Sequence, residues 1–173
     1  MKKRRFFALF LVLGLLVSLL SVPASAFEEI DVDARAALLV EKETGEILYE
    51  KNAHEKNYPA SITKLTVALL VFEAIDAGQL SLDQPITAHE SAFEGLSIYG
   101  STAGIKVGEV LTVEQLLQCM LIVSANEACN ILAEAVCGEG NISQFVQRMN
   151  ERAAALGCEN THYVNTSGLH DPD

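Results

Sequence analysis

The sequence predicts a mixed α+β domain in which one N-terminal β-hairpin precedes a group of helices. Residues 36–40 and 46–50 read as strands, and the turn between them contains Gly45, a residue that tolerates positive φ. Further along the chain, apolar residues recur with helical spacing in four segments that begin near residues 62, 112, 128 and 142. The chain has 173 residues, enough for one domain of moderate size.

The first 26 residues have the three-part layout of a secretory signal peptide. Four basic residues follow Met1, an apolar stretch covers 6–20, and Ala24-Ser25-Ala26 is a small-x-small cleavage site. A permanent membrane anchor is the alternative, but about 15 apolar residues are too few to span a bilayer, which takes roughly 20. We therefore expect cleavage after Ala26, with residues 27–173 exported across the cytoplasmic membrane.

The expected mature chain is strongly acidic. Removing the four leader residues from the twelve Lys and Arg leaves eight, against 23 Asp and Glu, so the formal net charge is −15. Such a charge argues against nucleic acid as a partner and against direct adhesion to anionic lipid.

The four cysteines do not form an obvious disulfide framework, although the chain is expected to be exported. Cys119, Cys129 and Cys137 fall in helical patterns, and the last two are about 12 Å apart along one helix, too far for a bridge. We expect them to be small buried residues, and a bridge from Cys158 to another helix remains open. The histidines are scattered without zinc-site spacing, so no metal is predicted.

The predicted elements follow in chain order. Residues 36–40 are expected to form a buried strand, 46–50 its partner, and 51–58 a polar connector. The segment 62–77 is apolar on all faces, which predicts a helix surrounded by protein and ended by Gly78.

Residues 79–111 are expected to be mostly irregular. Thr112-x-x-Gln115 is a capping box that starts the second helix, and Gly138 stops the third. Asn141 is expected to cap the fourth helix, which Gly157 ends. The remaining tail, 161–173, reads as a loop.

Ser61 and Lys64 are the first candidate functional residues. Pro59 keeps Ala60 and Ser61 from joining a preceding helix, and a long apolar run begins at Ile62, so a helix is expected to open at or just after Ser61. Three residues apart, Ser61 and Lys64 then share one face. A lysine held neutral by burial and by the helix dipole can take the proton of a serine and make it a nucleophile. Alternatively, Ser61 is only an N-cap and Lys64 only a surface charge.

Ser124 and Asn126 are the second candidate pair, in a break between two apolar helices. Here too a structural explanation exists, because Ser124-x-x-Glu127 is itself a capping box. Under that explanation Asn126 is a first-turn residue without a further role.

Taken together, the two pairs and their surroundings resemble the serine-type D-alanyl-D-alanine carboxypeptidases, the low-molecular-mass penicillin-binding proteins of bacteria. The segment 37–49 is similar to the first hairpin of that family, Ser61-Ile62-Thr63-Lys64 to its nucleophile motif, and Ser124-Ala125-Asn126 to its second motif. The segment 165–169, Asn-Thr-Ser-Gly-Leu, resembles the loop that follows the helical subdomain. The resemblance covers residues 35–173.

The resemblance implies a β-lactamase/transpeptidase-like fold with a helical subdomain, and an acyl transfer without metal or organic cofactor. Ser61 would attack the bond between two terminal D-alanines of a peptidoglycan stem peptide. Lys64 would take the Ser61 proton, Ser124 would pass a proton to the leaving D-alanine, and Asn126 would hold the substrate amide and steady Lys64. The enzyme would lie at the cell wall, on the extracellular or periplasmic face, with β-lactams as covalent inhibitors.

The sequence departs from the family at its third motif. The family carries Lys-Thr-Gly on a later strand, and neither Lys-Thr-Gly nor Lys-Ser-Gly occurs here before the sequence ends at Asp173. The expectation is an incomplete catalytic domain over residues 27–173, the N-terminal portion of such an enzyme. It would lack the C-terminal strands of the sheet and the C-terminal membrane anchor, and would be weakly active or inactive by itself.

Three alternative functions remain. A serine β-lactamase shares the Ser-x-x-Lys start but usually has Ser-Asp-Asn, where this chain has Ala125, and a later Glu-x-x-Asn. A D,D-endopeptidase shares every motif found here. A non-catalytic exported domain that only binds peptidoglycan is the alternative from another class.

Overall fold

The computed structural model describes residues 31–171, so the signal peptide expected at residues 1–26 lies outside the described residues. The described residues fall into two compact units, 31–55 and 56–171. Within the described residues, no helix is both long enough and apolar enough to cross a membrane.

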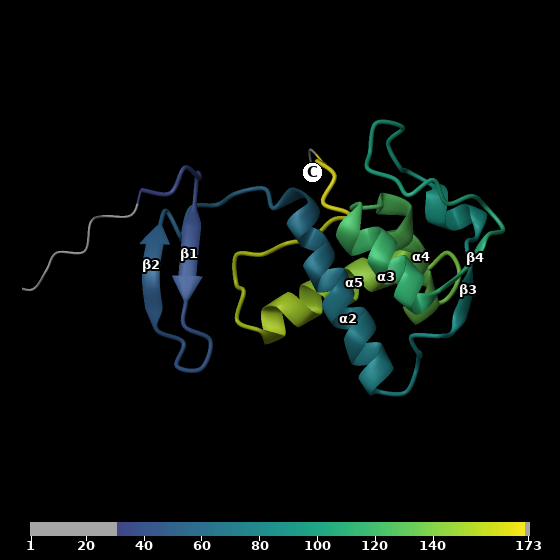
Figure 1. Cartoon of the computed structure of the whole chain (residues 1–173), viewed down its shortest axis with the longest axis horizontal. Coiled ribbons are helices and arrows are strands. Elements are labelled where there is room, and N and C mark those ends of the chain that lie inside the picture. The colour runs from purple at the N-terminus through teal and green to yellow at the C-terminus, as the bar shows by residue number, and fades with distance from the viewer. Residues whose placement is uncertain (1–30, 172–173) are drawn as a thin grey trace, which may run out of the picture. The chain divides into compact units, whose positions relative to one another are not determined.

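The first unit contains the predicted hairpin. β1 (Ala37–Val40) and β2 (Ile47–Lys51) pair antiparallel with Ala37 opposite Lys51, and the register shifts between Leu39 and Val40 (Figure 1). Gly45 has φ +74°, as the turn position requires. The hairpin and the residue that turns it are therefore confirmed.

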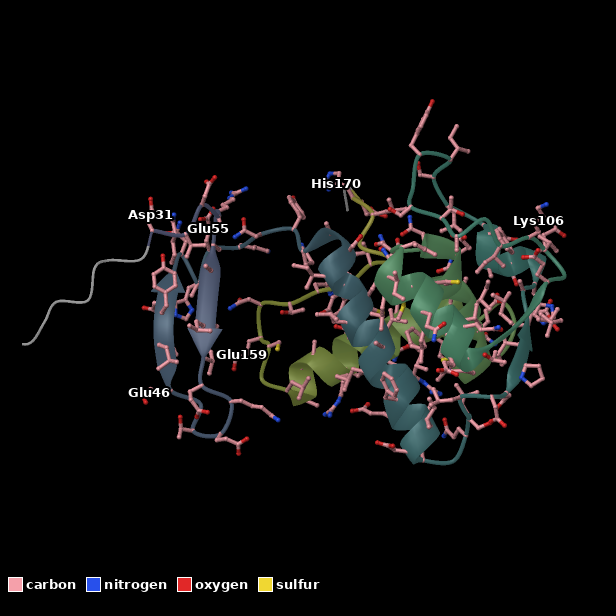
Figure 2. All side chains as sticks on the ribbon, viewed as in Figure 1. Asp31, Glu46, Glu55, Lys106, Glu159 and His170 are labelled. Carbon is pink, nitrogen blue, oxygen red and sulfur yellow. The ribbon has the colours of Figure 1, made fainter. Side chains whose placement is uncertain are left out.

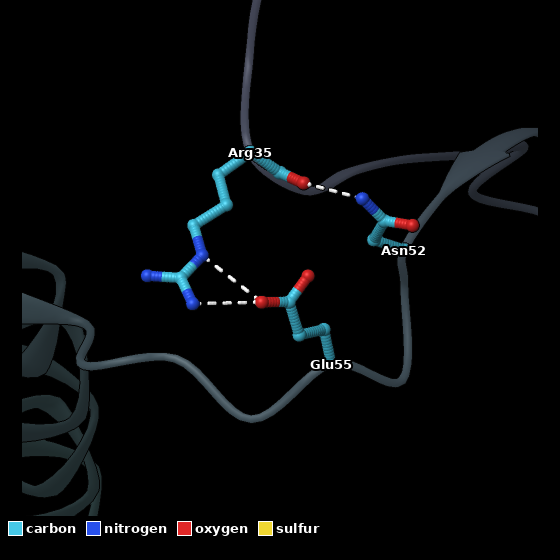
Figure 3. Close-up of polar contacts among 3 residues, drawn as sticks. All are labelled: Arg35, Asn52 and Glu55. Atoms are coloured by element: carbon cyan, nitrogen blue, oxygen red, sulfur yellow. Dashed lines mark hydrogen bonds and ion pairs between the residues drawn. The ribbon is translucent and has the colours of Figure 1, made fainter.

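Polar contacts tie the two ends of the hairpin together at its base. Both Nε and Nη2 of Arg35 contact Oε1 of Glu55, at 3.0 and 2.8 Å, and Asn52 Nδ2 donates to the Arg35 carbonyl at 2.9 Å (Figure 3). Because the Arg35 and Glu55 side chains are well exposed, their ion pair contributes little stability, on the order of 1 kcal/mol or less.

The expectation that the first strand is buried is wrong. Leu38 and Leu39 expose 56% and 55% of their surface. The reason is that the described part of this unit, residues 31–55, holds no third element that could cover either face of the two strands.

The second unit is built around α4 (Asn126–Cys137), which packs against three other helices: α2 (Lys64–Asp76), α3 (Val113–Ile122) and α5 (Ile142–Ala155) (Figure 1). The nine consecutive residues 126–134 of α4 are all buried. α4 therefore lies at the centre of the hydrophobic core, and each of the other helices packs one apolar face against it.

The helix after Ser61 differs from the prediction in two respects. A 3-10 turn, η1 (Ala60–Thr63), precedes it, and the α-helix begins only at Lys64. Its neighbours also lie on one side: Val67 and Val71 are fully buried, whereas Leu65 and Phe72 expose 61% and 45% of their surface. Among the described residues, α2 is thus not surrounded by protein, because its helical contacts come from the α3, α4 and α5 side.

Residues 79–111 contain more regular structure than expected. β3 (Pro85–Thr87) pairs antiparallel with β4 (Val110–Thr112), and η2 (Glu90–Phe93) lies between them in sequence. Three-residue strands are too short to show a period-2 pattern, and their pairing joins residues more than 20 positions apart.

Of the two predicted N-caps, the one at Thr112 is confirmed and the one at Asn141 is wrong. The Thr112 side chain accepts from Gln115 N–H while the Gln115 side chain accepts from Thr112 N–H, so the predicted capping box is present. Asn141 does precede α5, but its side chain makes no cap bond and instead donates to the carbonyls of Cys137 and Glu139.

The cysteines are all free, so the bridge left open for Cys158 is absent. The expectation that the helical cysteines are buried holds fully for Cys129, while Cys119 and Cys137 are half-buried.

Candidate active site

Ser61, Lys64 and Ser124, three of the four candidate residues, come together in one hydrogen-bonded group. Ser61 Oγ accepts from Lys64 Nζ at 3.2 Å and from Ser124 Oγ at 2.9 Å. Ala60 has φ +48°, which turns the chain so that Ser61 enters the 3-10 turn ahead of α2 with its side chain exposed. The accessible hydroxyl therefore lies between a lysine and a second hydroxyl.

Lys64 is the most unusual side chain of the group, because it is a long cationic residue with only 2% of its surface exposed. Its Nζ donates to Ser61 Oγ and to the Ser167 carbonyl at 2.9 Å. Burial, which disfavours the charged form, lowers the pKa of Lys64 below its ordinary value. A larger neutral fraction gives the amine the lone pair that a proton acceptor needs.

Ser124 does not act as a helix cap. α4 begins after Ala125 with no side-chain cap bond, and Ser124 has φ +60°, a conformation that costs free energy in a residue other than glycine. The Glu127 side chain contacts Thr102 and Ala103 instead. The structural explanation of Ser124-x-x-Glu127 is therefore wrong, and the strained backbone directs the Ser124 hydroxyl at Ser61.

The loop 165–169 positions the carbonyl that holds Lys64. Asn165 Oδ1 accepts from the backbone N–H groups of Ser167 and Gly168, and its Nδ2 donates to the Leu169 carbonyl. This side chain closes the loop on itself. The resulting tight turn presents the Ser167 carbonyl to Lys64, which lies 103 positions earlier in the chain.

A buried bond anchors the same loop to α4. Thr166 Oγ1 donates to Asn130 Oδ1 at 2.6 Å, and Asn130 Nδ2 donates to the Ala92 carbonyl at 2.9 Å. Thr166 and Asn130 are both buried. The Ser167 carbonyl is thus held through Thr166 by the central helix.

Replacing Thr166 with Val should lower the free energy of unfolding by about 1–3 kcal/mol, because the buried Asn130 Oδ1 loses its donor. Urea denaturation of Thr166→Val and of Thr166→Ser measures the effect. Thr166→Ser keeps the hydroxyl donor to Asn130 Oδ1 and should retain most of the stability. An unchanged denaturation midpoint for Thr166→Val would contradict the anchoring role.

A cleft of about 580 Å³ opens beside Ser61. Asn126 lines it together with residues of the Ser97–Gly104 and 165–171 segments. Tyr58 and His170 also line the cleft, and their rings meet edge to face with centroids 5.1 Å apart. Figure 2 shows His170 on the C-terminal segment, near the first turn of α2. The cleft offers room for a peptide-sized group next to the hydroxyl.

Cys129 lies close to Lys64 but is not a competing nucleophile. Its surface is fully buried, and its thiol donates to the Ala125 carbonyl at 3.3 Å. Burial raises the pKa of the Cys129 thiol to about 12, so it stays protonated at neutral pH. Within residues 31–171 no group of three His, Cys, Asp or Glu side chains could hold a metal ion.

Comparison with known proteins decides the family. The D-alanyl-D-alanine carboxypeptidase family (Peptidase_S11) matches residues 23–173. The chain belongs to this family. Among curated relatives, it is 35% identical over 161 residues to the D-alanyl-D-alanine carboxypeptidase DacF of Bacillus subtilis, covering 88% of this chain and 40% of the relative. It is also 35% identical over 144 residues to DacC of Escherichia coli, covering 82% and 36% respectively.

Solved structures of the family share the fold. The D-alanyl-D-alanine carboxypeptidase DacD of Francisella tularensis matches with a TM-score of 0.76 and 36% identity over 84% of this chain and 34% of that one. Penicillin-binding protein D2 of Listeria monocytogenes in its ampicillin-bound form matches with a TM-score of 0.69 and 31% identity, over 84% and 56%. The predicted transpeptidase-like fold is thus confirmed, and the chain spans about 40% or less of the curated relatives described above.

Several contributors to the site were not predicted from the sequence. The roles of Asn130, Thr166 and the Ser167 carbonyl depend on contacts between segments at least 36 positions apart. The family-like loop 165–169 was recognised, but nothing in its residues names Lys64 as its partner. Glu127 was interpreted only as part of a capping box with Ser124, so its contacts with Thr102 and Ala103 were not predicted.

Proposed function

We propose that the chain carries the nucleophile and its proton acceptor for a serine-type D-Ala-D-Ala carboxypeptidase, which trims the terminal D-alanine from peptidoglycan stem peptides. The observation that carries the proposal is the hydrogen-bonded group of Ser61, Lys64 and Ser124, with a buried lysine whose pKa is lowered. Family membership supports the same reaction class. The roles assigned to the four site residues are parts of this proposal.

In the proposed reaction, neutral Lys64 accepts the Ser61 proton while Ser61 Oγ forms a bond to the penultimate D-alanine carbonyl carbon. Collapse of the tetrahedral intermediate breaks the peptide C–N bond. Protonated Lys64 gives this proton up through the Ser124 hydroxyl to the departing amine. D-Alanine then leaves as the neutral amine, Lys64 is neutral again, and an acyl ester remains on Ser61. Water, activated by Lys64, then hydrolyses the ester and restores Ser61.

The substrate would lie in the cleft with its amide against Asn126, a buried residue that lines the cleft. The backbone N–H of Ser61, which is located at the first turn before α2, would contribute to stabilising the oxyanion. The family acts on the cell wall, which supports export of this chain to the extracellular or periplasmic face. The ampicillin-bound relative supports β-lactams as covalent ligands of Ser61.

Covalent labelling by a fluorescent penicillin tests the proposal. The purified chain should acquire a label that survives denaturing gel electrophoresis, and Ser61→Ala should acquire none, because the acyl ester has no other attachment point. Mass spectrometry should place the adduct on the peptide that contains Ser61. Labelling that persists in Ser61→Ala would overturn the assignment of the nucleophile.

The expectation that these 173 residues alone are weakly active or inactive stays a prediction. The rate of labelling, compared with that of a full-length family member under the same conditions, measures it. Release of D-alanine from a D-Ala-D-Ala peptide then distinguishes a carboxypeptidase from a β-lactamase, which would turn over nitrocefin instead. Binding of wall fragments that survives Ser61→Ala, without any penicillin adduct, would instead favour a non-catalytic domain.

A further inference from the structure

Glu127 holds a loop against the cleft. It is the second residue of α4, and only 3% of its surface is exposed. Its Oε1 accepts from the Thr102 hydroxyl at 2.6 Å and from the Ala103 N–H at 2.8 Å. Both donors belong to the Ser97–Gly104 loop. A buried carboxylate is costly unless its oxygens are bonded, so this side chain stabilises the fold only while the loop lies in this position.

The same loop meets Asn126, the neighbour of Glu127. The Asn126 backbone N–H donates to the Ser101 carbonyl at 2.9 Å. A Cβ atom built on Gly100 would lie 2.5 Å from Asn126 Nδ2, so a side chain there would require the Asn126 amide to shift. The loop backbone therefore abuts the Asn126 amide directly, and a shift of the loop would change the space available to that amide.

The other side of the loop faces the substrate space. Tyr99, Gly100 and Ser101 line the cleft beside Ser61, and 92% of the Tyr99 surface is exposed. Short-range bonds also shape the loop, from Gly100 N–H to the Ser97 carbonyl and from Gly104 N–H to Thr102 Oγ1. These local bonds set the turns of the loop, whereas the two Glu127 bonds join it to α4.

We propose that Glu127 is a positioning residue: its carboxylate fixes the Ser97–Gly104 loop as a wall of the cleft and thereby orients the Asn126 amide for the substrate. This inference rests on the proposed function for its catalytic consequence. Glu127 does not contact Ser61 or Lys64 through any hydrogen bond described for residues 31–171, so its loss should weaken substrate binding and leave proton transfer by Lys64 intact.

A carboxylate in the first turn of a helix is also favourable for the helix dipole alone. The two explanations differ for Glu127→Gln. The Gln side chain keeps an oxygen that can accept from Thr102 and Ala103 but loses the charge. A dipole role alone predicts that Gln and Ala behave alike, whereas the positioning role predicts that Gln preserves the loop and Ala does not.

The experiment compares Glu127→Ala, Glu127→Gln and Thr102→Val with the unmodified chain. Acylation by fluorescent penicillin, followed over a range of concentrations, separates the initial dissociation constant from the acylation rate constant. Glu127→Ala should raise the dissociation constant about 10- to 100-fold, since small displacements of a positioning group have effects of this size. The pH profile of the acylation rate constant should stay unchanged. Thr102→Val should have a smaller effect, and Glu127→Gln should remain close to the unmodified chain.

Amide hydrogen exchange gives a readout that does not depend on acylation. In Glu127→Ala the amides of Ala103 and Asn126 should exchange faster, while amides in the centre of α5 keep their protection, which shows that the domain is folded. Glu127→Gln should retain slow exchange at Ala103. Unchanged exchange at Ala103 in Glu127→Ala, or equal behaviour of the Ala and Gln variants, would overturn the inference. Labelling that persists in Ser61→Ala would refute the proposed nucleophile, and the exchange measurements would still decide whether Glu127 holds the loop.

Discussion

Lys64→Met should reduce the rate of Ser61 acylation about 100- to 10,000-fold, the range that a general base contributes. Met keeps the length and most of the volume of the buried side chain, so Val67 and its neighbours in α2 stay packed. It removes the amine that contacts Ser61 Oγ. The rate of penicillin labelling for the variant and for the unmodified chain measures the loss, and an unchanged rate would exclude Lys64 as the proton acceptor.

The same substitution should change the pH dependence of stability. Burial lowers the pKa of Lys64 in the folded state, whereas the unfolded chain keeps a value near 10.5. Between these two values the unfolded state binds more protons, so the free energy of unfolding rises with pH. Below the folded-state pKa both states are protonated, and the full cost of burying the cation is present; above 10.5 it is absent.

Lys64→Met removes this titration. The variant should be more stable than the unmodified chain below the folded-state pKa, and its free energy of unfolding should rise less with pH between the two values. Urea denaturation at several pH values, with Lys106→Met as an exposed control, measures both effects. A Lys64→Met variant that is less stable at every pH would indicate that the contact of Nζ with the Ser167 carbonyl outweighs the cost of burial.

Gly168→Ala should destabilise the domain by about 2–5 kcal/mol and slow acylation of Ser61. A Cβ atom at Gly168 would overlap the Ala60 carbonyl oxygen, so one of the two backbone segments has to move. The positive φ of +77° adds strain of about 1–2 kcal/mol, and crowding in a packed site adds about 1–3 kcal/mol. Because Ala60 precedes Ser61, the displacement reaches the proposed nucleophile.

Gly157→Ala is the matched control for this prediction. Gly157 has a similar φ of +81°, but a Cβ atom there would meet nothing within 4 Å. Gly157→Ala should therefore lose only the stability that corresponds to the conformational strain, and its acylation rate should stay unchanged. Thermal denaturation and penicillin labelling of the two variants separate the effects. Equal losses of stability in the two variants would contradict the close contact between the 165–169 loop and η1.

The predictions from local sequence were accurate where the interacting residues lie within one short segment. Thr112 and Gln115 cap each other within one helical turn, and Gly45 turns a short hairpin. Ser61 and Lys64 are three residues apart, so their proximity follows from helical geometry alone. The short strands β3 and β4 were missed because their pairing joins distant segments.

Burial was predicted least well, because it depends on what the rest of the chain supplies. The apolar residues at 62–77 indicated a helix covered on every side, yet Leu65 and Phe72 are exposed among the described residues. Leu38 and Leu39 are similarly exposed on β1. An apolar side chain is more stable when buried, but whether another element covers it depends on the tertiary structure.

The sequence by itself determined the family, the nucleophile motif and the second Ser-x-Asn motif, since these are patterns of residue type and spacing. Only the tertiary structure showed what Ser124 contacts. The same Ser-x-x-Glu pattern fits a helix cap, but Ser124 has φ +60° and its hydroxyl donates to Ser61 Oγ at 2.9 Å. The structure likewise brought the Ser167 carbonyl to Lys64 and Glu127 to the Ser97–Gly104 loop. Such contacts join segments far apart in the chain, and no local spacing encodes them.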